Sequence, residues 1–285
     1  MAERRPTWLI TGASSGIGRA LALEALNAGF KVLGATRSIS QAETNCPEVS
    51  SRGGTWVELD PAQPHAYHQV VKVSQEQSVD VLVNNAGYAF IGSVEDASEE
   101  EFRAQMQVNF YGPLRTVRAC LPAMRARGSG QIILISSGAG FTARPARGVY
   151  SASKFAIEAV HESLAQEVKS FGIKVLVVEP GAFRTPFASR IITPAHFSEG
   201  FSQIYEGTVV EQMITGHQTM KCLPDSVKGD PDKAARAIIH AAVGGHDYLR
   251  LPLGTDCVAA LELKIGELQH DLGATRAIAG STDAE

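Results

Sequence analysis

The sequence has few cysteines, no run of like charges and no long apolar stretch. Its 285 residues include four cysteines, at positions 46, 120, 222 and 257, and no CxxC or Cys/His cluster. The eight histidines form no ligand-spaced set, so we expect neither a disulfide framework nor a metal site. A net charge of −4 without a Lys/Arg run argues against nucleic-acid binding.

The absence of long apolar stretches also bears on location. No stretch approaches the about 20 apolar residues of a membrane span, and the N-terminal run Trp8 to Ile10 is too short for a signal peptide. We therefore expect a soluble, cytoplasmic protein. Hydrophobic residues make up 44% of the chain and charged residues 20%, which is ordinary for a globular enzyme. Without a linker or internal repeat, residues 1–285 are predicted to form a single domain.

Strand and helix patterns alternate along the chain. Short apolar segments at 7–11, 31–35, 54–59, 79–84, 131–136 and 173–179 are predicted strands, and periodic segments at 17–28, 64–77 and 148–171 are predicted helices. Some strands are apolar on both faces, as in buried parallel sheets. The alternation predicts an α/β fold with one doubly wound parallel sheet and helices on both faces.

Local signals mark further helix ends. Ser98 can cap a helix with acidic residues in its first turn, and Asp230 can cap a helix over 231–243. Pro113 breaks or kinks the helical pattern that runs on to Arg127. A short last strand at 248–251 and a final helix at 256–272 complete the prediction, within a C-terminal helix and tail at 255–285.

Residues 181–228 interrupt the alternation with aromatic and aliphatic side chains among polar ones. The segment follows the C-terminal end of a strand, where open α/β sheets bind ligands. We interpret it as a substrate lid and assign Phe187 and Ile191 to substrate contact. Its composition suggests an apolar or aromatic, mid-sized substrate, such as a ketone of secondary metabolism, a steroid or a retinoid. The alternative is packing of the same side chains against the core.

A glycine-rich turn joins the first strand to the first helix. Glycine permits positive φ and close backbone approach to a ligand, and the helix N-terminus attracts a pyrophosphate. The spacing is G-x-x-x-G-x-G rather than G-x-G-x-x-G, and an ordinary strand–helix turn is the alternative. The candidate dinucleotide-binding residues here are Gly12, Ser14, Ser15, Gly16, Ile17 and Gly18.

The end of the second strand indicates which dinucleotide binds. An acidic residue there would hold the ribose 2′-hydroxyl of NAD, but this chain has Thr36 and Arg37. A guanidinium suits a 2′-phosphate, so we predict NADP(H). The alternative is a solvated surface arginine.

Tyr150 and Lys154 lie four residues apart, one turn along a helix. A lysine ammonium at that distance favours the phenolate and is expected to lower the pKa of the tyrosine. The pair can then exchange a proton with an alcohol or a developing alkoxide. Taken alone, such a pair is more often a solvated helix face.

Together these features resemble the short-chain dehydrogenase/reductase family over nearly the whole chain. The resemblance rests on TGASSGIG at 11–18, NNAG at 84–87, Asn109, ISS ending at Ser137, YSASK at 150–154 and PGAFRT at 180–185. The gap of 13 residues between Ser137 and Tyr150 also matches the family. The family has a Rossmann-type fold.

The resemblance implies roles for the catalytic residues. Tyr150 would be the proton donor and acceptor, and Lys154 would lower its pKa and bind the nicotinamide ribose. Ser137 would position the substrate oxygen, and Asn109 would hold a water that links Lys154 to solvent. The alternatives are that Ser137 merely ends a strand and that Asn109 merely bonds helix backbone.

The resemblance also implies further cofactor contacts. Asp60 would contact adenine, Asn84 would lie under the adenosine ribose, and the Phe183 backbone and the Thr185 hydroxyl would hold the nicotinamide end. The further cofactor-binding candidates are Ala86, Gly87, Pro180 and Gly181. The NNAG motif has stabilisation of the sheet as its alternative role. Two positions depart from the family: Pro61 has no N–H to offer adenine, and Ser15 is not the basic residue of some NADP-dependent members. The prediction of NADP therefore rests mainly on Arg37.

The sequence thus predicts an NADPH-dependent carbonyl reductase or alcohol dehydrogenase that acts on a small apolar or aromatic molecule. One alternative is a non-redox isomerase, dehydratase or cyclase on the same scaffold, and another is a non-catalytic NADP-binding protein. Apolar helix faces around Asn109 and Tyr150 also favour a homodimer or homotetramer, with ordinary burial against the sheet as the simpler explanation.

Overall fold

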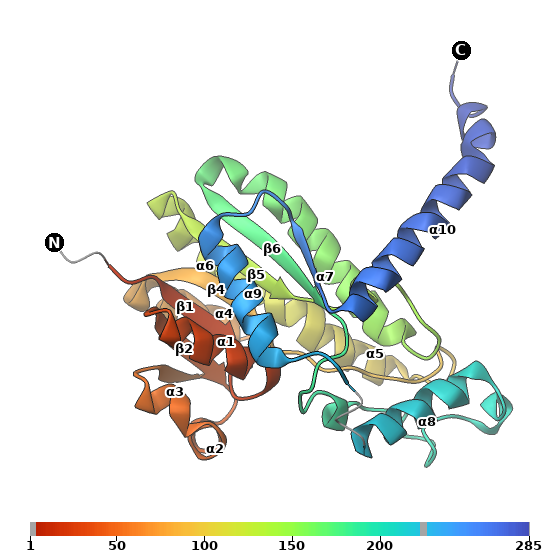
Figure 1. Cartoon of the computed structure of the whole chain (residues 1–285), viewed down its shortest axis with the longest axis horizontal. Coiled ribbons are helices and arrows are strands. Elements are labelled where there is room, and N and C mark those ends of the chain that lie inside the picture. The colour runs from red at the N-terminus through yellow and green to blue at the C-terminus, as the bar shows by residue number, and fades with distance from the viewer. Residues whose placement is uncertain (1–3, 223–226, 285) are drawn as a thin grey trace.

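The computed structural model describes residues 4–222 and 227–284, and within them one sheet of seven parallel strands runs through the molecule (Figure 1). The strand order is β3-β2-β1-β4-β5-β6-β7. The strands are β1 (Thr7–Thr11), β2 (Lys31–Thr36), β3 (Thr55–Glu58), β4 (Val79–Asn84), β5 (Gly130–Ile135), β6 (Ile173–Pro180) and β7 (Arg250–Leu253). The doubly wound parallel sheet predicted from the alternating pattern is confirmed.

Helices cover both faces of the sheet. The α-helices of the described chain are α1 (Gly16–Asn27), α2 (Ile39–Asn45), α3 (Pro47–Ser51), α4 (Ala66–Gln77), α5 (Glu99–Met106), α6 (Gly112–Arg127), α7 (Gly148–Glu167), α8 (Val209–Cys222), α9 (Pro231–Gly244) and α10 (Thr255–Gly280). Of these, α1 and α9 lie on one face of the sheet and α4, α6 and α7 on the other. Alternate strand residues divide the core: Ile10 packs towards α1 and α9, whereas Leu9 packs towards α4, α6 and α7. None of the helices in the described ranges is long and apolar enough to cross a membrane.

Several boundaries differ from the prediction. The segment 39–51 forms α2 and α3, two short polar helices without an amphipathic signal. The helix that starts at Gly148 ends at Glu167 and a 3₁₀ turn follows, and the last helix extends to Gly280 rather than residue 272. β7 begins at Arg250, two residues later than predicted.

Two predicted helix caps are present in the structure. Ser98 and Glu101 form a reciprocal capping box at the start of α5. The Asp230 side chain accepts hydrogen bonds from the N–H groups of Asp232 and Lys233 at the start of α9. Where Pro113 is predicted to break or kink the helical pattern, a π-helical turn over Gln107–Tyr111 leads into α6. Such turns are frequent at functional sites.

The segment 181–228 follows β6 and contains two 3₁₀ turns (Ala188–Arg190 and Gln203–Tyr205) before α8. It shares a small core with the loop after β4, in which Phe201, Tyr205 and Met213 pack around Ile91 and Ile214. Ile192 forms a single parallel bridge with Phe90 in the loop after β4. The segment is therefore attached beside the carboxyl edge of the sheet.

Candidate active site

The glycine turn after β1 is held in a conformation that requires glycine. Gly12 has φ +65° and Gly16 has φ +56°. A Cβ at Gly18 would lie 2.4 Å from the Gly12 oxygen and 2.3 Å from Asn85 Nδ2. The Asn85 amide donates hydrogen bonds of 2.9 and 3.1 Å to the backbone oxygens of Thr11 and Gly12. Asn85, which the sequence reasoning did not single out, thus ties the turn to the end of β4.

The N-terminus of α1 has the properties of an anion site. Ser15 occupies the N-cap, but its hydroxyl makes no capping hydrogen bond within the described chain. The first N–H groups of α1 therefore have no side-chain partner from Ser15. An open cavity of about 380 Å³ adjoins this end of the helix. It is lined by Ser14, Ser15, Gly16, Arg19, Ala20, Asn45, Arg184, Pro186, Arg190, Pro231 and Asp232. Free N–H groups and arginines on one wall fit a pyrophosphate.

The predicted adenosine-side residues lie at the ends of β2, β3 and β4. Arg37 is exposed just beyond β2, whereas the Thr36 hydroxyl is turned to the backbone oxygen of Ser38 at 3.2 Å. One Asp60 oxygen accepts the N–H of Ala62 at 3.0 Å and thereby closes its own turn. Asn84 is buried, and its side-chain oxygen accepts a 2.6 Å hydrogen bond from the Thr116 hydroxyl. This hydrogen bond joins β4 to α6.

Tyr150 and Lys154 lie on the first two turns of α7 and are buried, with 5% and 6% of their surface exposed. The Lys154 ammonium lies 5.9 Å from the centre of the Tyr150 ring and donates a 3.0 Å hydrogen bond to the Ile135 backbone oxygen. Gly87 lies beside them, since a Cβ there would be 3.9 Å from Lys154 Nζ. The pair thus sits where β4, β5 and α7 converge.

Burial dominates the electrostatics of this pair. It raises the pKa of Tyr150 above its ordinary value of 10, opposed by a hydrogen bond with Ser137 and by the Arg147 charge. Burial also lowers the pKa of Lys154 to about 8. The pKa of Tyr150 is thus shifted upward, opposite to the lowering expected from the spacing to Lys154, because burial is the largest cause of its shift.

Ser137 and Asn109 flank the pair. Ser137 begins the 3₁₀ turn Gly138–Gly140, and its hydroxyl accepts the Ala139 N–H at 3.1 Å. The Asn109 amide lies in the π-helical turn and donates to the Tyr88 oxygen at 2.9 Å and to the Ser153 hydroxyl at 3.1 Å. Asn109 therefore anchors the loop after β4 to α7.

The candidate nicotinamide-side residues follow β6. Pro180 ends that strand, and the Gly181 N–H donates to the Leu253 oxygen of β7 at 2.8 Å. A Cβ on Gly16 would lie 3.3 Å from Thr185 Cβ, so Thr185 reaches the glycine turn. Phe183 forms a bridge with Gly229. The Asp256 carboxylate, not identified from the sequence, accepts the Ala182 N–H at 2.8 Å and fixes this loop.

Phe187 and Ile191 reach the tyrosine from the segment 181–228. The ring centres of Phe187 and Tyr150 are 6.2 Å apart, and Phe187 is 39% exposed. Ile191 packs on the cluster formed by Ala89, Ala139 and Tyr150. The two residues predicted to contact substrate therefore lie against the tyrosine, although Ile191 also packs on the small core around Ile91 and Ile214.

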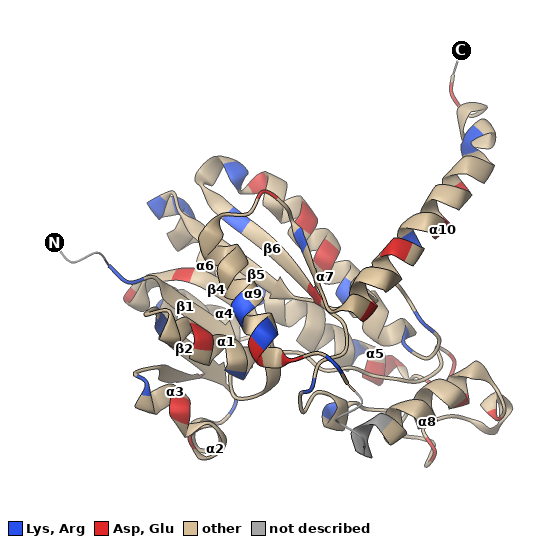
Figure 2. Cartoon of the chain, in the orientation of Figure 1, with Lys and Arg blue, Asp and Glu red and all other residues tan. Residues whose placement is uncertain are grey.

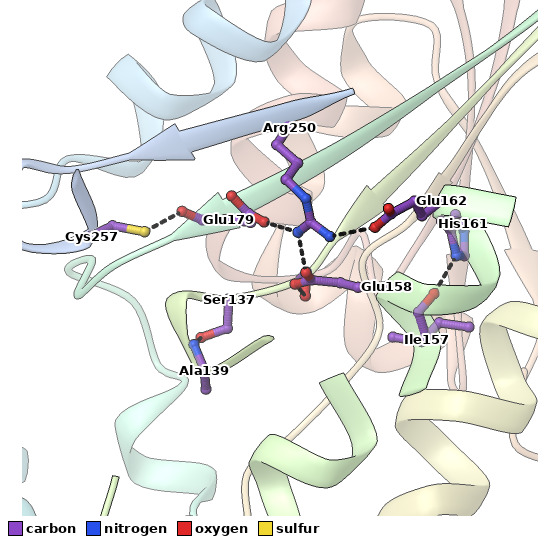
Figure 3. Close-up of polar contacts among 10 residues, drawn as sticks. Ser137, Ala139, Ile157, Glu158, His161, Glu162, Glu179, Arg250 and Cys257 are labelled. Atoms are coloured by element: carbon purple, nitrogen blue, oxygen red, sulfur yellow. Dashed lines mark hydrogen bonds and ion pairs between the residues drawn. The ribbon is translucent and has the colours of Figure 1, made fainter. Parts of the chain in front are cut away.

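A buried ion network involves the next turn of α7 after Lys154 (Figure 3). Glu158, one turn beyond Lys154 on α7, and Glu179 on β6 are almost completely buried, and the Arg250 guanidinium of β7 donates to both. Arg250 also reaches Glu162 at 3.0 Å, and the Ser136 hydroxyl donates to Glu158. Burial, with repulsion from Glu158, raises the pKa of Glu179 to about 7. The network joins α7, β6 and β7 beneath the site.

The family model for short-chain dehydrogenases matches residues 6–195, which include both the glycine turn and the Tyr150/Lys154 pair. The chain belongs to the short-chain dehydrogenase/reductase family. A short-chain dehydrogenase from Streptomyces avermitilis has the same fold, with a TM-score of 0.86 at 36% sequence identity over 99% of this chain and 100% of that one.

Curated members of the short-chain dehydrogenase family are also similar in sequence. Oxidoreductase claN of Passalora fulva is 44% identical over 209 residues, which are 73% of this chain and 94% of that protein. Human retinol dehydrogenase 8 is 35% identical over 205 residues, which are 70% of this chain and 66% of that protein. The chain is therefore an oxidoreductase of this family.

Proposed function

We propose that the protein is an NADP(H)-dependent carbonyl reductase or alcohol dehydrogenase. The observation that supports this most is the buried Tyr150, with Lys154 one turn along α7 and the Phe187 ring 6.2 Å from its own. A phenol in this position can exchange a proton with a carbonyl or hydroxyl oxygen that enters beside Phe187. When bound, the nicotinamide supplies or accepts the hydride.

The direction of the tyrosine pKa fits proton donation. Because burial raises the pKa of Tyr150 above its ordinary value, the phenol carries the proton that a reduced carbonyl oxygen needs. Ser137 orients that oxygen by hydrogen bonding and stabilises the negative charge that develops on it. Lys154 holds its ammonium near the ring, and Asn109 keeps the loop after β4 against α7.

The preference for NADP(H) over NAD(H) rests on the end of β2. Arg37 is exposed there and offers a guanidinium for charge-assisted hydrogen bonds to a 2′-phosphate. Thr36 already donates its hydroxyl to Ser38, and neither position carries the acid that a ribose 2′-hydroxyl would favour. Arg184 and Arg190 add positive charge beside the pyrophosphate position.

We further propose that residues 181–228 form the substrate lid and that the substrate is an apolar or aromatic, mid-sized ketone or secondary alcohol, as in secondary, steroid or retinoid metabolism. Phe187 and Ile191 would form the apolar wall opposite Ser137. The similarity to retinol dehydrogenase 8 supports a substrate of this class.

A screen of ketones and secondary alcohols with NADPH, NADP, NADH and NAD tests the proposal, with absorbance at the reduced-nicotinamide band as the readout. We expect turnover of apolar substrates with NADPH and several-fold less with NADH. Conversion of a substrate without any change at that band would instead support an isomerase, dehydratase or cyclase. Binding of NADPH without turnover of any substrate would support a non-catalytic protein.

We also propose a homodimer or homotetramer that buries the outer faces of α6 and α7. Phe155 on α7 is 42% exposed, and Tyr111 at the start of α6 is 46% exposed. Aromatic side chains this exposed on adjacent elements favour a partner surface.

A further inference from the structure

Helix α10 (Thr255–Gly280) projects from the body of the protein (Figure 1). Its first turn is anchored to the rest of the described chain: Cys257 is buried with its thiol on the Glu179 backbone oxygen, and the Asp256 carboxylate accepts the Ala182 N–H. From Glu262 to the end of the described chain at residue 284, every residue except Lys264 is exposed. Among the described residues, nothing covers the outer turns of α10.

The exposed part of α10 carries a heptad stripe. Apolar or small residues recur with alternating spacings of three and four, which is the pattern of a coiled-coil seam. Three of its large members, Ile265, Leu268 and Leu272, are 47%, 56% and 54% exposed. The stripe consists of Val258, Leu261, Ile265, Leu268, Leu272, Thr275 and Ala279.

The helix is poorly stabilised by its own residues. Gly266 and Gly273 lie in its interior, outside the stripe, and glycine is the least favourable helix residue after proline. Helices in water draw most of their stability from packing of an apolar face. A projecting helix with two internal glycines and an uncovered stripe therefore favours a partner that buries the stripe.

The charges beside the stripe identify the partner as a second copy. Consider two copies of α10 packed antiparallel, with Ile265 of one opposite Leu268 of the other. This alignment also places Leu261 opposite Leu272, and Val258 opposite Thr275.

In that register the flanking charges pair without any like-charge contact. Glu262 of one copy faces Arg276 of the other, and Lys264 faces Asp271, each pair occurring twice by the two-fold symmetry. Figure 2 shows acidic and basic residues along α10. A parallel alignment pairs only Asp271 with Arg276. Antiparallel packing is thus the arrangement in which all four flanking charges have partners.

We infer that α10 is a self-association element that forms an antiparallel two-helix coiled coil with a second copy of this chain. This surface is separate from the α6 and α7 faces, so both interfaces together would give a tetramer. A membrane surface is a poorer partner, because acidic residues outnumber basic ones along the helix (Asp256, Glu262, Glu267 and Asp271 against Lys264 and Arg276).

The test compares two leucines of the same helix. Leu268 lies in the stripe and Leu263 outside it, and they are 56% and 66% exposed. We expect Leu268→Lys to halve the mass of the full chain in light scattering or sedimentation, and Leu263→Lys to leave it unchanged. A parent chain that stays at 30.3 kDa at every concentration, or equal masses for the two variants, overturns the inference. A monomeric parent that floats with phosphatidylcholine vesicles would assign α10 to lipid and also overturn it.

A charge exchange tests the register. Arg276→Glu places two glutamates opposite each other in the antiparallel pair and should weaken association. The double variant Glu262→Arg/Arg276→Glu restores opposite charges and should restore the parent mass. In a parallel pair, the glutamate introduced at position 276 would still face Asp271, so a double variant that stays dissociated contradicts the antiparallel arrangement.

Discussion

Replacing Arg250 should destabilise the fold in a way that depends on pH. Glu158 and Glu179 are 2% and 0% exposed at their side chains and share the Arg250 guanidinium, which is 34% exposed (Figure 3). In Arg250→Met, the two carboxylates lose the cation that offsets their desolvation. Removal of one partner of a buried ion pair costs about 3–5 kcal/mol, and the partial exposure of Arg250 favours about 3 kcal/mol.

The pH dependence has a definite sign. The pKa of Glu179 is raised from 4.5 to about 7, so this group's contribution to stability is full below about pH 4.5 and is lost as the pH rises through about 7. Removing Arg250 takes away a cation that opposes this rise in pKa. The stability difference between parent and variant should therefore be larger at pH 8 than at pH 5.

Urea and thermal unfolding at both pH values measure this difference. A loss of about 3 kcal/mol corresponds to a fall in Tm of about 6–10 °C. The matched control is Arg103→Met, whose ion pair with Glu99 is 76% and 74% exposed and should contribute less than about 1 kcal/mol. Adding Glu179→Gln to Arg250→Met should recover part of the loss. A loss no larger than that of the control, or one independent of pH, would refute this reasoning.

Three further changes probe the cofactor and substrate positions. Arg37→Asp should lower kcat/KM for NADPH by about 10- to 100-fold and leave kcat/KM for NADH unchanged or higher. An equal fall in kcat/KM for both cofactors would contradict the 2′-phosphate assignment. Phe187→Ala should raise KM for an apolar ketone while the Kd of NADPH stays constant, and a parallel loss of both would count against substrate contact. Gly18→Ala should abolish NADPH binding in calorimetry, because its Cβ would lie 2.4 Å from a backbone oxygen of the turn. The control Gly244→Ala should leave NADPH binding intact, because a Cβ there meets no atom of the described residues within 4 Å beyond its own helix backbone.

The fold was predictable because its signals are local. The apolar runs of β1, β4 and β6 and the turn at Gly12–Gly18 are each contained within a few residues, and their order along the chain determines a parallel sheet. The short helices α2 and α3 were missed because seven and five mostly polar residues leave no periodic signal. The length of α10 was underestimated because its last two turns lack a strong apolar pattern.

The motifs of the site were predictable from the sequence, but the long-range contacts that hold them in place were not. Tyr150 and Lys154 are a local pattern, whereas Asp256 and Ala182 are 74 residues apart, and Arg250 lies 92 residues from Glu158. Such contacts exist only after folding. The pKa of Tyr150 also depends on tertiary burial, which explains why spacing to Lys154 alone gave the wrong direction.

The most direct test of the central claim is the turnover of Tyr150→Phe on a ketone that the parent reduces with NADPH. The substitution removes one hydroxyl and keeps the ring that packs against Phe187 and Ile191. Loss of a positioned proton donor should lower kcat by about 10²- to 10⁴-fold. The Kd of NADPH should stay within about twofold, as it should for Tyr67→Phe, a control on the face of the sheet covered by α4. Turnover of Tyr150→Phe at the parent rate would contradict the account.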